Sequence, residues 1–359
     1  MPRERDYVSL FNRSIRDFFL DALRVSFRDP AMACFVYQTI RRQKRAEQVR
    51  LDWEKRGFHV PPFMIVSITK RCNLQCKGCY ARAQHRSAEA EMSADKLRSV
   101  IAEAAELGVS IILIAGGEPL TRPEVLDITQ GFPQVIFPLF TNGMLLDEQV
   151  TARLKKQRHV VPVISLEGRQ IDTDGRRGEG VYGHVLSTMH RLRREGVFFG
   201  TSVTLTSRNF GLATGKEFLQ KLMATGCKLF FYVDYVPVQE GTEELALTTE
   251  QRAAEPEIML ALHKELPGLF VAFPGDEEMY GGCLAAGRGF VHVSPEGRLE
   301  PCPFSPFSDV SLKDVPLKEA LQSQLLRTIR ESGAHLGETR GGCALWERRE
   351  WVGSLLQTE

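Results

Sequence analysis

Three cysteines stand close together near the end of the first fifth of the chain: Cys72, Cys76 and Cys79. Cysteine thiolates are ligands for zinc and for iron–sulfur clusters. Four cysteines would complete either kind of site, whereas three leave one metal position open to a small-molecule ligand. The spacing therefore predicts an iron–sulfur cluster with one reactive iron. The alternatives are a zinc site that borrows a ligand from elsewhere, and cysteines that share no function.

Polar and glycine-rich turns follow several predicted strands. After the second strand, glycines let the backbone approach a ligand closely and a glutamate offers an acceptor for an ammonium group. Ser165 and Glu167 close the fourth strand and point the same way, because alternate strand residues share a face. The candidate residues at these turns are Gly116, Gly117, Glu118, Pro119, Asn142, Ser165 and Glu167. For Asn142 we expect either a ligand contact or a role in shaping the loop. A strand-to-helix turn with a capping glutamate is the alternative for Glu118.

Further candidates lie later in the same region. Arg177 falls in an Asp-Gly-Arg-Arg-Gly stretch and can pair a carboxylate with two hydrogen bonds, although a surface ion pair is the alternative. Thr204 ends the fifth strand, and Asp234 and Tyr235 end the sixth. A carboxylate among apolar residues at a strand end can hold substrate, so Asp234 and Tyr235 are the catalytic candidates. A structural hydrogen bond is the alternative for Asp234.

These residues require a scaffold that gathers strand ends. Six apolar segments, rich in Val, Ile and Phe, alternate with helical patterns, which predicts parallel βαβ units with functional residues at the carboxyl ends of the strands. The predicted strands are 63–69, 111–115, 135–140, 160–165, 199–204 and 230–236. Pro138 weakens the third of them, since proline donates no ladder hydrogen bond. With a net charge of +1, the chain has no field that would attract nucleic acid.

The run from Cys72 to Tyr80, followed by Gly116–Pro119, resembles the radical S-adenosylmethionine (SAM) superfamily. The resemblance implies an α/β fold, a partial (β/α)6 barrel over residues 58–268 that is similar to a TIM barrel. It also implies a [4Fe–4S] cluster on the three cysteines, with SAM on the open iron. Reductive cleavage of SAM would give a 5′-deoxyadenosyl radical that abstracts a substrate hydrogen. By the same resemblance, SAM would contact Tyr80, Gly116, Gly117, Glu118, Pro119, Asn142, Ser165, Glu167, Arg177 and Thr204. Many members carry an aromatic residue where this chain has Gly78, so Tyr80 or backbone is expected to replace that contact.

A second group of cysteines, Cys283, Cys302 and Cys343, lies beyond the predicted barrel. Around a predicted hairpin (290–293 and 299–300) it resembles the auxiliary-cluster modules called SPASM and twitch. This implies a small α+β module over residues 269–359 with a second [4Fe–4S] cluster. The fourth ligand stays open, with Cys227 among the candidates, and a zinc knuckle or free thiols are the alternatives. Otherwise Cys34 and Cys227 are expected to be buried core residues.

Residues 1–57 read as helices with an apolar stripe, and Asp29-Pro30 predicts the start of the second helix. We expect a helical extension that covers one side of the barrel. The alternative is peripheral membrane contact or partner docking, because Phe and Arg lie on opposing faces. No secretory signal and no membrane span is recognised in the sequence, which favours a cytoplasmic protein with metal-binding rather than disulfide-bonded cysteines.

The sequence thus predicts a radical SAM enzyme of oxidoreductase type, in which an auxiliary cluster assists an oxidation or an oxidative bond formation. One alternative is transfer or coupling of a group on a lipid, peptide or metabolite. Another is a non-catalytic Fe–S electron carrier or scaffold. We expect a small-molecule, lipid or peptide substrate and a reducing donor such as a flavodoxin or ferredoxin. No leader-peptide-binding domain is recognised, which lowers the expectation of a peptide.

Overall fold

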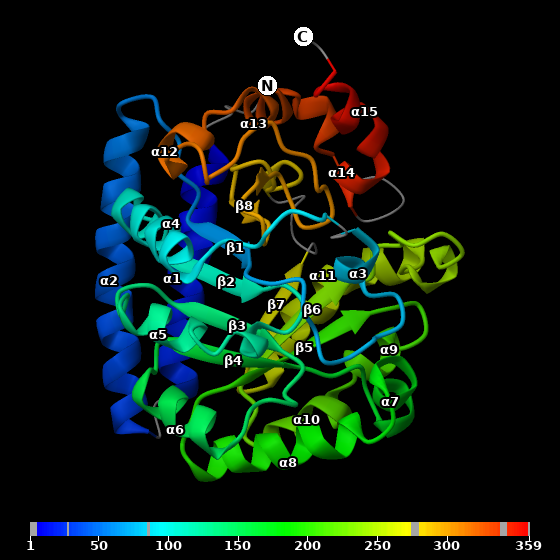
Figure 1. Cartoon of the computed structure of the whole chain (residues 1–359). Coiled ribbons are helices and arrows are strands. Elements are labelled where there is room, and N and C mark those ends of the chain that lie inside the picture. Colours follow the sequence, from blue (N-terminus) through cyan, green and yellow to red (C-terminus); the bar gives the residue numbers. More distant parts are fainter. Residues whose placement is uncertain (1–5, 27–28, 85–86, 274–279, 338–342, 358–359) are drawn as a thin grey trace.

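A single sheet of nine strands organises the computed structural model, which describes residues 6–26, 29–84, 87–273, 280–337 and 343–357. The strand order is β7-β6-β5-β4-β3-β2-β1-β8-β9 (Figure 1). Strands β1 to β7 run parallel to their neighbours, β8 is parallel to β1, and β9 is antiparallel to β8. The strands are β1 (Phe63–Ser67), β2 (Ile111–Ala115), β3 (Phe137–Thr141), β4 (Val160–Ser165), β5 (Gly200–Leu205), β6 (Leu229–Asp234), β7 (Leu269–Phe273), β8 (Phe290–Val293) and β9 (Leu299–Glu300). The predicted α/β partial barrel is confirmed.

Helices connect the parallel strands and cover the outer face of the sheet (Figure 1). The α-helices are α1 (Asp6–Ser26), α2 (Pro30–Glu54), α3 (Tyr80–Gln84), α4 (Ala94–Leu107), α5 (Val125–Gln130), α6 (Glu148–Lys156), α7 (Gln170–Arg177), α8 (Val181–Arg194), α9 (Phe210–Ala213), α10 (Lys216–Ala224), α11 (Thr249–Glu265), α12 (Leu317–Ala320), α13 (Gln324–Glu331), α14 (Ala344–Glu347) and α15 (Arg349–Ser354). Short 3-10 helices are η1 (Pro119–Thr121), η2 (Glu243–Leu245) and η4 (Gly333–His335). In α4, the Ser93 hydroxyl accepts from the Lys96 amide at the start, and Gly108 ends the helix at a φ of 96°.

Helices α1 and α2 pair with each other and close the amino ends of the strands. Ile15 and Phe19 of α1 pack with first strand residues such as Ile111 and Leu229. Figure 1 shows α2 along the side where strands β1 to β4 begin. The apolar stripe of the N-terminal extension therefore forms the floor of the barrel, as the covering-arm interpretation expects.

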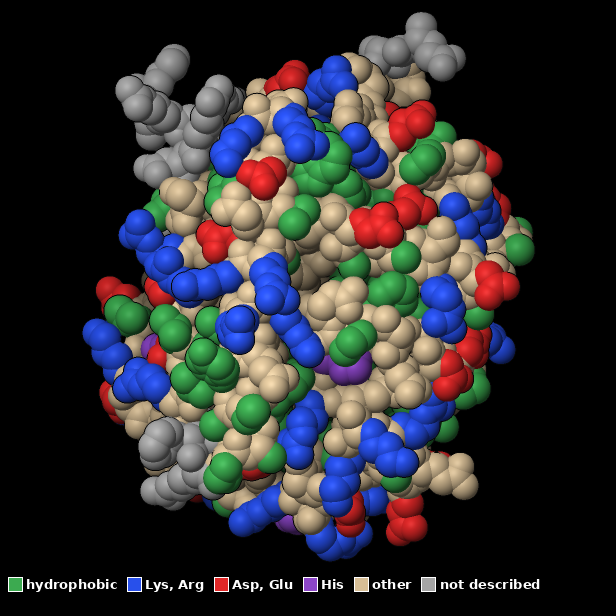
Figure 2. Space-filling view, turned by 90° about the vertical axis from the view of Figure 1, so that its left-hand side faces the viewer, with side chains coloured by type: hydrophobic (Ala, Val, Ile, Leu, Met, Phe, Trp, Pro, Cys, Tyr) green, Lys and Arg blue, Asp and Glu red, His purple; other side chains and the backbone are tan. Residues whose placement is uncertain are grey.

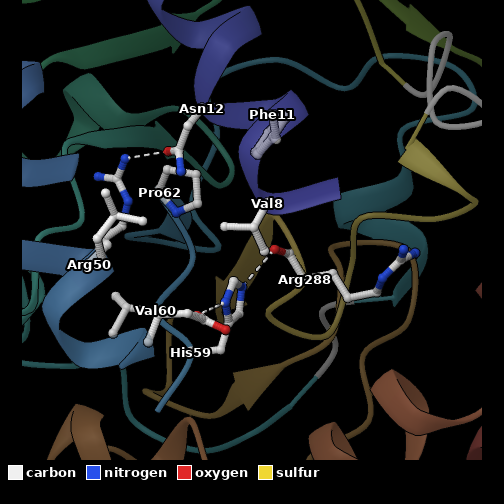
Figure 3. Close-up of a pocket in the computed structure, with 10 residues that line it drawn as sticks. Val8, Phe11, Asn12, Arg50, His59, Val60, Pro62 and Arg288 are labelled. Carbon is white, nitrogen blue, oxygen red and sulfur yellow. Dashed lines mark hydrogen bonds and ion pairs between the residues drawn. The ribbon is translucent and has the colours of Figure 1, made fainter. Parts of the chain in front are cut away.

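A buried arginine ties this floor together. The Arg50 guanidinium donates to the Asn12 carboxamide oxygen at 2.7 Å and to the Gly108 carbonyl at 2.7 Å, so it links α2 to α1 and to the end of α4 (Figure 3). Burial lowers the pKa of Arg50 to about 10. Next to it, His59 contacts the Arg288 carbonyl at 2.9 Å and connects the floor to the C-terminal region (Figure 3).

The C-terminal hairpin continues the barrel sheet, because β8 pairs with β1 from Phe63↔Phe290 to Val66↔Val293. Its His292 is fully buried between the Ser67 hydroxyl, 2.8 Å from Nε2, and the Glu300 carboxylate, 2.7 Å from Nδ1. This buried chain of hydrogen bonds locks β9, β8 and β1 in one register.

Several elements differ from the prediction. Strand β7 lies beyond the expected boundary at residue 268 and still belongs to the parallel sheet. The sequence predicts one helix near 317–331, and this is wrong, because Ser323 caps a new helix and separates α12 from α13. Cys34 is exposed on α2, whereas Cys227 is buried as expected. Pro138 lies in β3, which is an interior strand of the sheet. Within these two strands as described, β3 and β2 share one ladder pair, Ile114↔Leu139.

Among the described helices, none combines the length and apolar character needed to cross a bilayer.

Candidate active site

The cysteine loop after β1 opens onto a cavity of about 940 Å³ inside the barrel. Cys72, Cys76 and Cys79 all border this cavity; Cys72 is exposed, and the other two residues are half-buried. Gly116 and Gly117, at the end of β2, border the same space. Residues from the first two strand ends therefore meet at the carboxyl edge of the sheet, where the βα-loops of such folds form active sites.

The two glycines are required by close backbone packing. A Cβ at Gly117 would lie 2.2 Å from the Arg71 carbonyl oxygen, and one at Gly116 would lie 2.5 Å from that of Thr69. The amides of Gly117 and Glu118 donate to the Thr69 and Arg71 carbonyls at 2.7 and 2.8 Å. The turn after β2 is thus hydrogen-bonded to the start of the cysteine loop and fixes its path.

Glu118 is buried behind this turn and joins the ends of two strands. Its carboxylate accepts from the Thr141 hydroxyl at 2.8 Å, the Asn142 amide at 2.7 Å and the Leu120 amide at 3.1 Å. Burial raises the pKa of Glu118, and these hydrogen bonds oppose the rise. Neither Glu118 nor Pro119 is among the described residues that border the cavity. A contact of Glu118 with an ammonium group stays a prediction.

Asn142 connects the third strand end to the cysteine loop. Its side-chain amide donates to the Asn73 carboxamide oxygen at 2.7 Å and lies 3.9 Å from the Cys72 sulfur. Asn142 also borders the cavity. It therefore shapes the loop and has access to a ligand, which accommodates both of the expected roles.

An acidic side chain holds two arginines against the cysteine loop. Glu167 Oε1 accepts from Arg176 at 2.6 Å and from Arg177 Nε at 2.8 Å. Arg176 also donates to the Thr204 hydroxyl at 2.8 Å and to the Lys77 carbonyl at 3.1 Å. Arg177 reaches to 4.0 Å from the Cys76 sulfur. Glu167 is buried and does not reach the cavity wall, whereas both arginines do.

Arg176 is a site residue that the sequence-based prediction missed. It could have been found from the Asp-Gly-Arg-Arg-Gly stretch that also contains Arg177. Because α7 places two successive arginines near one carboxylate, both belong to the site. The hydroxyls of Ser165 and Ser202 lie 3.3 Å apart on the same wall.

Tyr235 occupies the space beside Gly78. A Cβ at Gly78 would lie 2.7 Å from the Tyr235 hydroxyl, and Gly78 has a φ of 64°. Tyr235 is 3% exposed, borders the cavity, and its hydroxyl has no hydrogen-bond partner among the described residues. A buried hydroxyl without a partner is unfavourable. Neighbouring Asp234 also borders the cavity and lies 3.7 Å from Arg252.

Tyr80 points toward the C-terminal region. Its ring lies 4.9 Å from that of Phe304, and Gln84 on the same helix donates to the Phe304 carbonyl at 3.2 Å. Burial, with smaller contributions from Cys79, Cys302 and Glu300, raises the pKa of Tyr80. Tyr80 therefore lies between the two groups of cysteines, although it still borders the cavity.

The second group of cysteines is buried. The Cys283 amide donates to the Leu336 carbonyl at 2.8 Å, and the Ala286 amide donates to the Pro301 carbonyl at 3.0 Å, next to Cys302. Ala286 has a φ of 55°, so the chain turns sharply after Cys283. Cys227 instead donates to the Leu229 carbonyl at the amino end of β6.

The surroundings of the first cysteine group disfavour thiolates in the absence of a bound cation. Burial raises the pKa values of Cys72 and Cys76, and neighbouring thiolates raise them further, while Arg177 opposes the rise at Cys76. A bound iron cluster would supply the positive charge that keeps these ligands deprotonated. In the described part of the chain, no group of three or more His, Cys, Asp or Glu side chains has the arrangement of a metal site as it stands. Holding a cluster at either group would require its thiols to approach one another more closely.

Comparison with known families decides what this edge of the sheet is. The model of the radical SAM superfamily matches residues 66–225. Residues 66–225 are a radical SAM domain. The domain contains the cysteine loop and the first five strand ends, and the superfamily carries a [4Fe–4S] cluster and SAM.

Two relatives extend the similarity beyond this radical SAM domain. The chain is 28% identical over 324 residues to the AdoMet-dependent heme synthase of Methanosarcina barkeri, covering 81% of this chain and 90% of the relative. It is 27% identical over 320 residues to the mycofactocin maturase MftC of Mycobacterium tuberculosis, covering 80% of each chain. SuiB of Streptococcus suis bound to S-adenosylmethionine shares the fold, with a TM-score of 0.63 at 17% identity over 82% of this chain and 73% of SuiB.

Proposed function

We propose that this chain cleaves SAM reductively with a [4Fe–4S] cluster on Cys72, Cys76 and Cys79. The observation that carries the proposal is that these thiols, the Gly116-Gly117 turn and the Arg176–Arg177 pair border one cavity at the carboxyl edge of the sheet. When held by these thiols, the cluster would supply the electron for reductive cleavage of SAM to methionine and a 5′-deoxyadenosyl radical, which would abstract a hydrogen atom from the substrate.

The chain's own residues bind and orient SAM. The Gly116-Gly117 backbone offers close approach, and Asn142 and Arg177 supply donors beside the thiols. Ser165 and Thr204 place hydroxyls on the same wall. Glu167 acts through the arginines that it holds, so it is a positioning residue.

We propose further that Cys283, Cys302 and Cys343 hold a second [4Fe–4S] cluster, in the C-terminal region that follows β7. After hydrogen abstraction, the substrate radical would give one electron to this cluster and one proton to a base. The substrate thereby loses two hydrogens, one of them to 5′-deoxyadenosine. Asp234 borders the cavity and is the candidate base. A flavodoxin or ferredoxin would reduce the first cluster.

Contact with a membrane surface is a secondary proposal for residues 1–57. The apolar stripe of α1 is used by the barrel floor. The outer face of α2 exposes Tyr37 beside Arg41 and Lys44. Figure 2 shows basic side chains spread over this side of the molecule, with apolar ones between them. Such a surface would attract anionic lipid headgroups.

The test of the main proposal is an anaerobic assay. Protein reconstituted with iron and sulfide, and treated with dithionite and SAM, is expected to form 5′-deoxyadenosine. A Cys72/Cys76/Cys79→Ala triple variant is expected to form none. SAM binding measured by calorimetry separates a site that binds without turnover from a site that does not bind. Failure of the loaded protein to bind SAM would refute the proposal.

A further inference from the structure

The inner wall of the barrel is apolar and only partly covered. On β2 and β3 the outward side chains of Ile112, Ile114 and Leu139 are wholly buried beneath the helices. Their inward neighbours Leu113 and Phe140 stay partly exposed, and both border the cavity. The opposite wall repeats the pattern with Phe231, Val233 and Val271. Apolar side chains that line an internal space gain free energy when an apolar group covers them.

The apolar lining continues from the thiols to the floor. Ile15 and Phe19 of α1, and Met32 and Val36 of α2, border the same cavity as Cys72. We call this inner part, between the strand walls and the α1–α2 floor, the lumen. The polar groups expected to bind SAM lie at the thiol end, so the lumen is left for the substrate.

Few charged side chains border the cavity away from the thiols, and they come from α1, α11 and the loop before β4, near the floor. Asp21 pairs with His263 at 2.8 Å, and Asp17 is exposed on the same helix as Asp21. Arg158 is the cationic residue among the described lining at this end. At the thiol end, Arg176 and Arg177 are already paired with Glu167. A substrate with several carboxylates would therefore bury charges without partners.

A peptide is disfavoured for a related reason. Its amide groups need hydrogen-bond partners when they leave water. The strands that wall the lumen, such as β2, β4 and β5, lie inside a parallel sheet and already pair on both sides. An uncharged chain of methylene or isoprene units needs no such partners.

We propose that the lumen holds the apolar chain of a lipophilic substrate, an acyl or isoprenoid chain, with its reacting carbon at the thiol end. This inference rests on the proposed function and names the substrate class of that site. Each methylene that leaves water for this apolar wall would strengthen binding. The seam between α1 and α11 is a suitable entrance, because Leu20 and Leu260 are 45% and 56% exposed beside the Asp21–His263 pair.

The test measures binding of a labelled probe by equilibrium dialysis. Radiolabelled farnesol is added to the reconstituted full chain with SAM and without reductant, so the result does not depend on SAM cleavage. Val233→Trp fills the lumen and is expected to weaken binding at least about tenfold. Val49→Trp is the matched control, because Val49 lies exposed on α2, and it is expected to bind as the parent does. Val271→Trp is the second lumen variant if Val233→Trp loses its circular dichroism spectrum or its iron.

Competition identifies the class of occupant. Unlabelled farnesol is expected to displace the probe at lower concentration than coproporphyrin III, a macrocycle with four carboxylates. Displacement by coproporphyrin III at equal or lower concentration would overturn the proposal. The same holds for undetectable farnesol binding, or for a folded lumen variant that binds as the parent does. Because SAM cleavage is assayed separately, a protein that forms 5′-deoxyadenosine but binds no farnesol overturns this inference alone.

Discussion

At the residue scale, the contact between Gly78 and Tyr235 explains a departure from the superfamily pattern. The sequence predicts that Tyr80 or backbone replaces the missing aromatic residue, and Tyr80 packs against Phe304 while it also borders the cavity. Tyr235, from the end of β6, fills the space beside Gly78. This pairing could not be read from the sequence, because it depends on how the strand ends meet across the barrel.

We predict that Tyr235→Phe has opposite effects on stability and on ligand binding. The hydroxyl is buried without a partner among the described residues, so its removal is expected to raise the free energy of unfolding of the ligand-free protein by up to about 1 kcal/mol. If the hydroxyl bonds SAM or substrate, the dissociation constant measured by calorimetry rises by about two- to tenfold. Lower stability together with unchanged binding would contradict the predicted role.

Glu167 gives a second prediction at this scale. Glu167→Gln keeps the shape of the side chain but leaves Arg176 and Arg177 without a buried counter-charge. We expect a loss of about 3–5 kcal/mol in the free energy of unfolding, measured by urea denaturation, together with weaker SAM binding. Glu265→Gln is the matched control, since its ion pair with Lys216 is exposed and is expected to contribute at most about 1 kcal/mol. Equal effects of the two substitutions would rule out the positioning role of Glu167.

At the element scale, most of the sheet was predictable and its edges were not. The segments that became β1 to β6 are apolar on both faces, and that continuous pattern is a strong signal. Strand β7 follows α11 after a very short connection and precedes a region of different composition. It therefore has no clear signal in the sequence, and it joins the sheet by pairing with β6. The break between α12 and α13 depends on one capping residue, Ser323.

The attachment of the floor helices leads to a prediction about Arg50. Arg50→Met leaves the Asn12 oxygen and the Gly108 carbonyl without their donor, which costs about 1–3 kcal/mol for each group. Removal of a desolvated charge offsets part of this loss, so we expect a net decrease of about 2 kcal/mol in the free energy of unfolding. Arg45→Met, on the exposed face of α2, is expected to change stability by less than about 0.5 kcal/mol. Urea denaturation of both variants would measure these changes in the free energy of unfolding.

At the scale of the whole molecule, the barrel and the C-terminal region are in direct contact. Strand β8 pairs with β1, and α3, which follows the cysteine loop directly, packs on Phe304 beside Cys302. The sequence could place each group of cysteines but not this proximity, because no local pattern records a contact between segments so far apart. Tyr80 borders the cavity and packs on Phe304, two residues after Cys302.

The last prediction concerns the number of clusters. A Cys283→Ala/Cys302→Ala double variant is expected to bind about four irons per chain, against about eight for the reconstituted parent. Because the cysteine loop after β1 is untouched, this variant should still form 5′-deoxyadenosine while losing the oxidised product. Cys227→Ala is the control, since this buried thiol donates to the Leu229 carbonyl at the start of β6 and its loss should leave the iron content unchanged. Iron and sulfide analysis, together with electron paramagnetic resonance of the reduced proteins, distinguishes one cluster per chain from two. Equal iron content in the parent and the double variant would refute the second cluster. The electron from the substrate radical would then need another acceptor.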